Sequence, residues 1–278
     1  MQIKHETFNW KDGKTKYFGQ LWSPESPKAV VAIVHGMGEH SGRYERTANR
    51  LNQGGYAVIS YDQIGHGKTD GKRGHSPDMD TLYRAAVKVL EEAESRFPGL
   101  PVFIYGHSMG GNVTANTLLK FKPNVKAAVL SSPWIRLAFP PPKFQVLLGR
   151  LMMKIYPAYS DSSKLDTSAI SRIPEEVKLY EEDPLVHDLI TPAMFFPTVD
   201  AGLWALAEAK ALQLPVYIFH GTGDQLTDHT ASDELKNQIG ENATIRKWEG
   251  GYHELHHDTD KEQVLNEVVQ WLDEQLEN

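Results

Sequence analysis

Short apolar runs alternate along the chain with segments of helical periodicity. Apolar runs rich in Val, Ile and Tyr lie at 29–36, 56–62, 101–108, 125–133 and 214–221, and a last strand-like run lies at 243–248. Such runs are typical of strands buried on both faces. Helix-like segments lie at 43–53, 78–97, 108–122 and 261–276. Parallel strands need helical crossovers, so the pattern predicts an α/β fold: a mostly parallel sheet with helices on both faces.

Two stretches depart from this alternation. Before residue 23, two β-prone runs flank Asp12-Gly13, a turn signal that predicts an N-terminal hairpin. Between residues 133 and 199, prolines and short helix-like pieces replace the alternation, and we interpret this stretch as an insertion. We therefore expect a core formed by 1–132 and 200–278, with a cap or lid at 133–199.

Composition excludes several classes of chemistry and partner. The chain has no cysteine, which rules out disulfides, cysteine-based metal sites and a thiol nucleophile. Its 29 basic and 36 acidic residues give a net charge of -7, so we expect no nucleic-acid partner. No run of about 18 apolar residues and no signal-like N-terminus is present, so we expect a cytoplasmic protein, at most peripheral to a membrane.

The candidate nucleophile is Ser108. It stands in Gly106-His107-Ser108-Met109-Gly110, a G-x-S-x-G sequence between an apolar run and a helical pattern. Two glycines permit a tight strand-to-helix turn, which exposes the serine hydroxyl at a helix N-terminus. The alternative is a glycine-rich turn in which Ser108 only caps the helix.

A serine hydroxyl needs a base, and the base needs an acid to orient it. In hydrolases with this turn the order along the chain is Ser, then Asp or Glu, then His. Asp224 directly follows the 214–221 run and is our candidate acid. Asp228 is its competitor, although we prefer a role for it in capping the next helix. His253, which follows the last strand-like run, is the candidate base.

His253 begins the sequence HELHH, which also matches the zinc-binding pattern H-E-x-x-H. That pattern requires both histidines on one helix, whereas "EGGY" precedes His253 and the closing helix starts only after Asp258. We therefore expect no metal here and place His256 and His257 in a loop. The glycine-rich turn after residue 34 should add a second backbone donor, so the amides of Met37 and Met109 are predicted to form an oxyanion hole.

Five blocks of the chain carry a resemblance to a known family: HGMGEHSGRY, DQIGHGKTDG, GHSMGG, GTGDQLTD and EGGYHELHHD. They are similar to the signature blocks of the monoglyceride lipase and lysophospholipase branch of the α/β-hydrolases. It implies an α/β-hydrolase fold and a serine ester hydrolase that needs no cofactor. The implied substrate is a monoacylglycerol or similar single-chain lipid ester, under a mobile cap.

The resemblance also implies that Glu39, Arg43 and Tyr180 contact the alcohol end of the substrate. The alternatives are a surface position for Arg43 and a partly buried cap position for Tyr180. The same machinery would serve a general carboxylesterase, a lysophospholipase, a thioesterase or an acyltransferase. A catalytically silent α/β-hydrolase binding module is the non-enzymatic alternative.

Within the insertion, apolar residues recur at helical spacing. They are Phe144, Leu147, Leu148, Leu151, Met152 and Ile155, while Lys143, Arg150 and Lys154 lie elsewhere on the helical wheel. A helix of this kind either packs on a core or serves as a lid that transiently contacts a membrane or micelle surface. Its position in the insertion favours the lid.

Overall fold

The computed structural model describes residues 2–139 and 141–277. Within them, eight strands form one sheet in the order β1-β2-β4-β3-β5-β6-β9-β10. The strands are β1 (Ile3–Asp12), β2 (Thr15–Pro24), β3 (Ala29–Val34), β4 (Tyr56–Tyr61), β5 (Val102–His107), β6 (Ala127–Ser131), β9 (Val216–Gly221) and β10 (Ala243–Trp248). From β4 to β10 all neighbours are parallel, which confirms the predicted α/β class.

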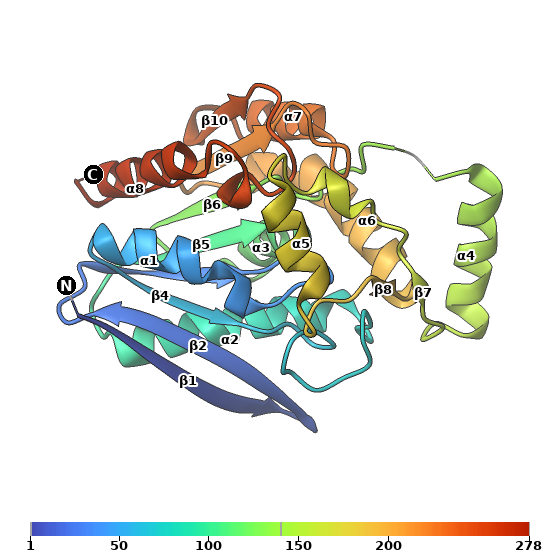
Figure 1. Ribbon diagram of the computed structural model, residues 1–278, viewed down its shortest axis with the longest axis horizontal. Coiled ribbons are helices and arrows are strands. Elements are labelled where there is room, and N and C mark those ends of the chain that lie inside the picture. The colour runs from blue at the N-terminus through green and yellow to red at the C-terminus, as the bar shows by residue number, and fades with distance from the viewer. Residues whose placement is uncertain (1, 140, 278) are drawn as a thin grey trace.

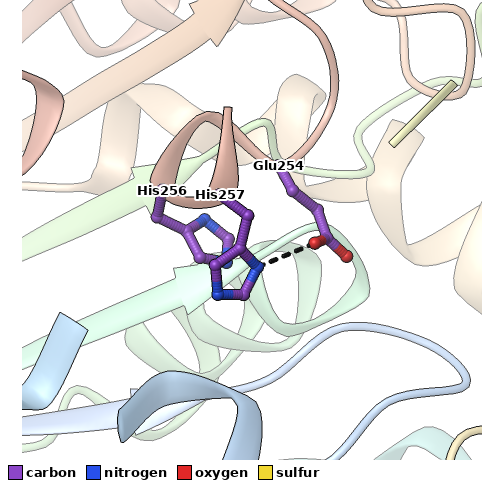
Figure 2. Close-up of side chains that lie close together, drawn as sticks. All are labelled: Glu254, His256 and His257. Carbon is purple, nitrogen blue, oxygen red and sulfur yellow. Dashed lines mark hydrogen bonds and ion pairs between the residues drawn. The ribbon is translucent and has the colours of Figure 1, made fainter. Parts of the chain in front are cut away.

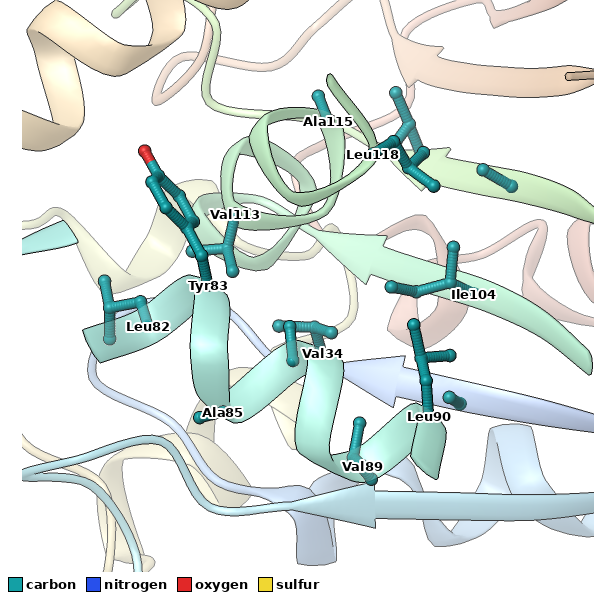
Figure 3. Packing of buried hydrophobic residues seen from close by; sticks show 14 of the residues in the cluster. Val34, Leu82, Tyr83, Ala85, Val89, Leu90, Ile104, Val113, Ala115 and Leu118 are labelled. Carbon is teal, nitrogen blue, oxygen red and sulfur yellow. The ribbon is translucent and has the colours of Figure 1, made fainter. Parts of the chain in front are cut away.

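The parallel strands are buried on both faces because helices cover each side. Helices α1 (Glu45–Gln53) and α8 (Lys261–Glu277) cover one face, and α2 (Met79–Arg96), α3 (Met109–Phe121) and α7 (His229–Ile239) cover the other (Figure 1). Alternate residues of β3 point to opposite faces: Val30 and Val34 join one core, and Val31 and Ile33 join the other. Figure 3 shows the first of these cores between the sheet and helices α2 and α3. This two-sided burial explains the continuous apolar runs in the sequence.

The N-terminal hairpin is present as predicted. β1 and β2 pair antiparallel with Asp12 opposite Thr15, and Gly13 adopts a φ of 57° in the turn between them. β2 then pairs antiparallel with β4. The hairpin thus adds an antiparallel edge to the otherwise parallel sheet.

Between residues 133 and 208, three helices lie beyond the carboxyl ends of the parallel strands: α4 (Lys143–Ile155), α5 (Pro174–Glu182) and α6 (Pro192–Glu208) (Figure 1). The two-residue strands β7 (Asp161–Ser162) and β8 (Leu189–Ile190) pair with each other. Helix α6 crosses the expected boundary between residues 199 and 200. The sequence pattern did not predict this helix, because Pro197 lies inside it and proline normally interrupts a helix.

Helix α5 and helix α4 differ in how they are attached. Glu176 of α5 forms ion pairs with Arg46 at 2.7 Å and Lys261 at 2.9 Å, so α5 is tied to α1 and α8 of the core. Helix α4 stands apart from the body in Figure 1, and none of its residues is buried. It approaches α6 through Gly149, whose added Cβ would meet the Phe196 ring at 2.6 Å, and through an Arg150–Asp200 ion pair at 2.7 Å.

The apolar side of α4 therefore faces away from the protein. Phe144, Leu147 and Ile155 are 69%, 74% and 69% exposed. The alternative in which this helix packs its apolar side on a core is wrong. Among the described residues, no helix combines the length and the apolar character needed to cross a bilayer.

Candidate active site

Ser108 lies in a strained turn between β5 and α3. Its φ of 52° and ψ of -118° are rarely adopted by residues other than glycine, and such a conformation costs about 1–3 kcal/mol. The flanking glycines permit the turn: an added Cβ at Gly106 would lie 2.4 Å from the Gly110 carbonyl oxygen, and one at Gly110 would lie 2.0 Å from that of Val34. The Ser108 side chain makes no capping hydrogen bond to α3. Its hydroxyl is thus free for another role than helix capping.

Asp224 and His253 form a buried pair. Asp224 follows β9, and its Oδ1 accepts hydrogen bonds from the backbone N–H groups of Leu226 and Thr227, at 2.8 and 3.1 Å. These bonds direct Oδ2 toward Nδ1 of His253, at 2.7 Å. The other ring nitrogen, Nε2, has no hydrogen-bond partner in the described chain.

The strand register brings the serine to the same edge of the sheet as this pair. His107 of β5 pairs with Ser131 of β6, and Ser131 pairs with Phe219 of β9. Ser108 and the loop after β9 therefore both follow strand ends at the same edge of the sheet. The rings of His107 and His253 are 4.8 Å apart between centroids. Ser108 itself makes no side-chain hydrogen bond to His253 in the described chain. Bonds of this kind are often long in enzymes without substrate.

The electrostatic environment favours an ionised acid and a basic histidine. Burial would lower the pKa of His253, but the charge and hydrogen bond of Asp224, with the field of Glu254, raise it above its ordinary value. Burial would raise the pKa of Asp224, but the charge of His253 and the hydrogen bonds from His220 and His253 hold it well below its usual range. His107 behaves differently, because burial next to His253 lowers its pKa to about 4.

Asp228 occupies the position predicted for it. Its Oδ1 accepts a hydrogen bond from the N–H of Thr230 at 2.8 Å and caps α7, while Oδ2 pairs with Arg136 at 2.8 Å. Its carboxylate forms no hydrogen bond or ion pair with His253 among the described residues. The helix-capping role is therefore confirmed.

The turn after β3 lies next to the nucleophile. A Cβ added at Gly36 would be 3.2 Å from the Cβ of Ser108, and the Gly36 N–H donates to Glu39 Oε1 at 2.6 Å. The backbone N–H groups of Met37 and Met109 have no hydrogen-bond partner in the described chain. Two unpaired donors near a serine hydroxyl are what an oxyanion hole requires.

The HELHH segment forms a short 3₁₀ turn, Leu255–His257, rather than part of a long helix. Glu254, His256 and His257 lie close enough for a metal ion (Figure 2). However, the Arg43 guanidinium donates two hydrogen bonds of 2.7 Å to Glu254 and lies 3.3 Å from His257 Nδ1. His256 instead packs between the rings of Tyr44 and His107. This arrangement does not fit a metal ion, because the Arg43 guanidinium already pairs with both oxygens of the Glu254 carboxylate.

Arg43, Glu39 and Tyr180 are brought together near the same turn. Arg43 pairs with Glu39 at 2.8 Å, and its guanidinium carbon lies 4.6 Å from the centre of the Tyr180 ring. The side chain of Arg43 is only 9% exposed, so the alternative of a surface position is wrong. Tyr180 is buried at the end of α5, and its hydroxyl has no hydrogen-bond partner in the described chain. Both carboxylate oxygens of Glu39, by contrast, accept hydrogen bonds, from the Gly36 N–H, the Tyr44 hydroxyl and Arg43.

The sequence analysis assigned no role in the site to three residues that contact its members: His220, Thr227 and Glu254. His220 and Thr227 place polar atoms 3.0 and 2.8 Å from Asp224 Oδ2. Glu254 pairs with Arg43, which is 211 residues away. The only signal for His220 was its position four residues before Asp224, and no periodicity distinguishes such a residue from an ordinary buried one.

The fold, the strained serine turn and the buried Asp–His pair define an α/β-hydrolase of the serine type. Residues 25–260 match the family described as "Serine aminopeptidase, S33", and the chain belongs to this family.

Individual relatives match over most of the chain. It is 34% identical to the "Monoglyceride lipase homolog" of Monkeypox virus, over 91% of this chain and 92% of that protein. It is 30% identical to the "Monoacylglycerol lipase" of Mycolicibacterium smegmatis, over 94% of each. The crystal structure of Paleococcus ferrophilus monoacylglycerol lipase superposes with a TM-score of 0.84 at 32% identity, covering 99% of this chain and all of that one. By contrast, the chain spans 28% of the length of an abhydrolase domain-containing protein of Dictyostelium discoideum to which it is 32% identical.

Proposed function

We propose that this serine hydrolase releases fatty acid from monoacylglycerols or similar single-chain lipid esters, with Ser108 as nucleophile, His253 as base and Asp224 as acid. The observation that carries the residue roles is the 2.7 Å bond between Asp224 and His253 Nδ1, which leaves Nε2 unpaired at the sheet edge where Ser108 lies. The names of the relatives support the substrate class. The resemblance and this mechanism require no cofactor.

In the first half-reaction Ser108 Oγ bonds to the ester carbonyl carbon while its proton moves to His253 Nε2. The carbonyl oxygen becomes an anion facing the amides of Met37 and Met109. When the tetrahedral intermediate collapses, the bond to the alcohol oxygen breaks and His253 returns the proton to that oxygen. In the second half-reaction a water oxygen bonds to the acyl carbon while His253 takes a proton from the water. The bond to Ser108 Oγ then breaks, His253 returns the proton to Oγ, and the fatty acid is released.

We further propose that the alcohol part of the substrate lies near Tyr180. Its hydroxyl is unpaired in the described chain and lies 3.4 Å from where a Cβ at Gly38 would be, beside the oxyanion turn. Glu39 and Arg43 support this end of the site. A comparison of kcat/KM for monoacylglycerols, diacylglycerols, lysophospholipids and short soluble esters tests the substrate class, and a preference for short esters would favour the general carboxylesterase.

The family description raises peptide hydrolysis as a second candidate. An aminopeptidase needs an anionic group for the free α-amino end of its substrate. The carboxylates near this site, Glu39 and Glu254, are 2% and 3% exposed and both pair with Arg43. This pairing favours esters, and amino-acid p-nitroanilides should be turned over far more slowly than monoacylglycerols.

The pH dependence of the reaction should report the environment of His253. The base must be neutral to accept a proton, and its raised pKa means that it becomes protonated at a higher pH than an ordinary histidine. We therefore expect kcat/KM to fall about tenfold per pH unit below a midpoint that lies above pH 6.5. A pH profile with a soluble ester measures this midpoint. A midpoint at or below 6.5 would contradict the role given to Asp224.

We propose that residues 133–199 form the cap and that the apolar side of α4 contacts a membrane or micelle surface. The double variant Leu147→Glu, Leu151→Glu should lower activity on vesicle-bound monoacylglycerol about tenfold or more, because two leucines lose a favourable transfer into lipid. Activity on soluble p-nitrophenyl butyrate should be unchanged, since neither leucine is buried in the protein.

The matched control is Gln145→Glu, which adds a negative charge to an exposed position on the flank of the same helix. It should keep most of the activity on vesicles. Equal losses in the control and the double variant, or a parallel loss on the soluble ester, would argue against lipid contact by the apolar side.

A further inference from the structure

The acid of the site is bonded to a second histidine. His220, near the end of β9, has its Nε2 3.0 Å from Asp224 Oδ2, the same oxygen that faces His253 Nδ1. His220 is fully buried, and its Nδ1 lies 2.8 Å from the hydroxyl of Ser232 on α7. The catalytic mechanism described above does not use His220.

The bonding pattern fixes which nitrogen of His220 carries the proton. An ionised carboxylate only accepts hydrogen bonds, so the nitrogen facing Asp224 must donate. The opposite nitrogen then accepts from the Ser232 hydroxyl. Burial lowers the pKa of His220, against the effect of its bond to Asp224, and this favours the neutral ring with one proton.

We propose that His220 is a positioning residue for the triad: through Nε2–H it holds Asp224 Oδ2 toward His253 and shares the carboxylate charge that acts on that base. This inference rests on the proposed function. The Thr227 hydroxyl is a third donor near Oδ2, at 2.8 Å, and its single proton has the backbone carbonyl of Ser132, at 3.2 Å, as an alternative acceptor. On its other side, His220 bonds to Ser232 of α7. His220 therefore connects the Asp224 carboxylate to helix α7.

Sharing the carboxylate has a predictable electrostatic consequence. A hydrogen bond to an anion stabilises it, so removing the His220 donor leaves more of the negative charge to stabilise protonated His253. Other groups act on both rings. The neighbours of His220 are Asp224, His253, His229 and Lys247 with its partner Asp233, and those of His253 are Asp224, His220, His107, Glu254 and Glu39. Apart from His220 itself, all of these residues remain when His220 is replaced, so the difference between the leucine and glutamine variants reports the shared carboxylate.

The experiment compares His220→Leu with His220→Gln on a soluble ester over a range of pH. Leucine fills a similar space without a donor, whereas the glutamine amide can donate to Asp224 and accept from Ser232. For His220→Leu we expect kcat to fall about tenfold and the acid limb of kcat/KM to move up by about half a pH unit. His220→Gln should restore both. His229→Gln is the control for a neighbouring histidine that bonds to Lys247 rather than to Asp224, and its limb should match the parent.

A limb that stays in place or moves to lower pH in the leucine variant, or shifts equally in the glutamine variant, would overturn the positioning role. If His220→Leu does not fold, Ser232→Ala carries the test. It removes only the hydroxyl behind His220 and should move the limb in the same direction by a smaller amount, whereas an unmoved limb would overturn the inference. Ser108→Ala is measured beside these variants: activity that survives there refutes the proposed function itself, whatever the His220 variants show.

Discussion

Replacement of Ser108 by alanine is expected to lower kcat for ester hydrolysis by about 10⁵-fold or more, because the group that forms the acyl bond is lost and no cysteine is available to replace it. The residual rate should come only from binding and the oxyanion donors. Initial rates on a soluble ester and on monoacylglycerol vesicles measure the effect.

The matched control for this variant is Ser163→Ala, because Ser163 is an exposed serine directly after β7. It should retain the parental rate. The Ser108→Ala protein should fold, because the Ser108 side chain makes no capping bond to α3. Alanine, like serine, has a Cβ atom, so the backbone conformation at position 108 is no more strained than in the parent. A folded Ser108→Ala protein with the parental rate would rule out Ser108 as nucleophile.

The second large effect is expected at Asp224. Asp224→Asn should lower kcat by about 10⁴-fold, because a neutral amide cannot stabilise the imidazolium and does not hold the required tautomer of His253. The buried carboxylate accepts bonds from two backbone N–H groups, the Thr227 hydroxyl and two histidines, so the amide would also place an N–H against another donor. The kinetics of a soluble ester and the thermal midpoint of unfolding should both be measured.

Asp228→Asn is the matched control because it makes the same chemical change four residues away. Asparagine caps a helix about as well as aspartate, so α7 should remain intact, and only the partly exposed pair with Arg136 is weakened. Activity should stay close to that of the parent. If the two asparagine variants lost activity equally, or if Asp228→Asn lost more, the acid would be assigned wrongly.

The sheet was predictable because its strands are buried on both faces, which leaves continuous apolar runs such as 29–34. The placement of Ser108, Asp224 and His253 after strands was predictable, because each follows an apolar run in the chain order typical of the serine turn. Helix α6 was not predictable from the sequence, because Pro197 interrupts the local helical pattern. Packing of α6 against the core maintains the helix in the structure.

Other features depend on contacts that a local pattern does not contain. Periodicity predicted an apolar side for α4, but its outward direction follows from how Gly149 and Arg150 meet α6. Likewise, the sequence showed Glu254 only as part of an apparent zinc-binding pattern. Its ion pair with Arg43 depends on the fold, which brings the two residues together. The roles of polar residues brought together from distant segments therefore needed the three-dimensional structure.

The most direct test of the account is the site of covalent modification by a fluorophosphonate, located by mass spectrometry of peptides from the labelled native protein. We expect one adduct per chain, on the peptide that contains Ser108, formed in parallel with the loss of ester hydrolysis. An adduct on another residue, or full hydrolysis by protein whose Ser108 is completely modified, would contradict the account.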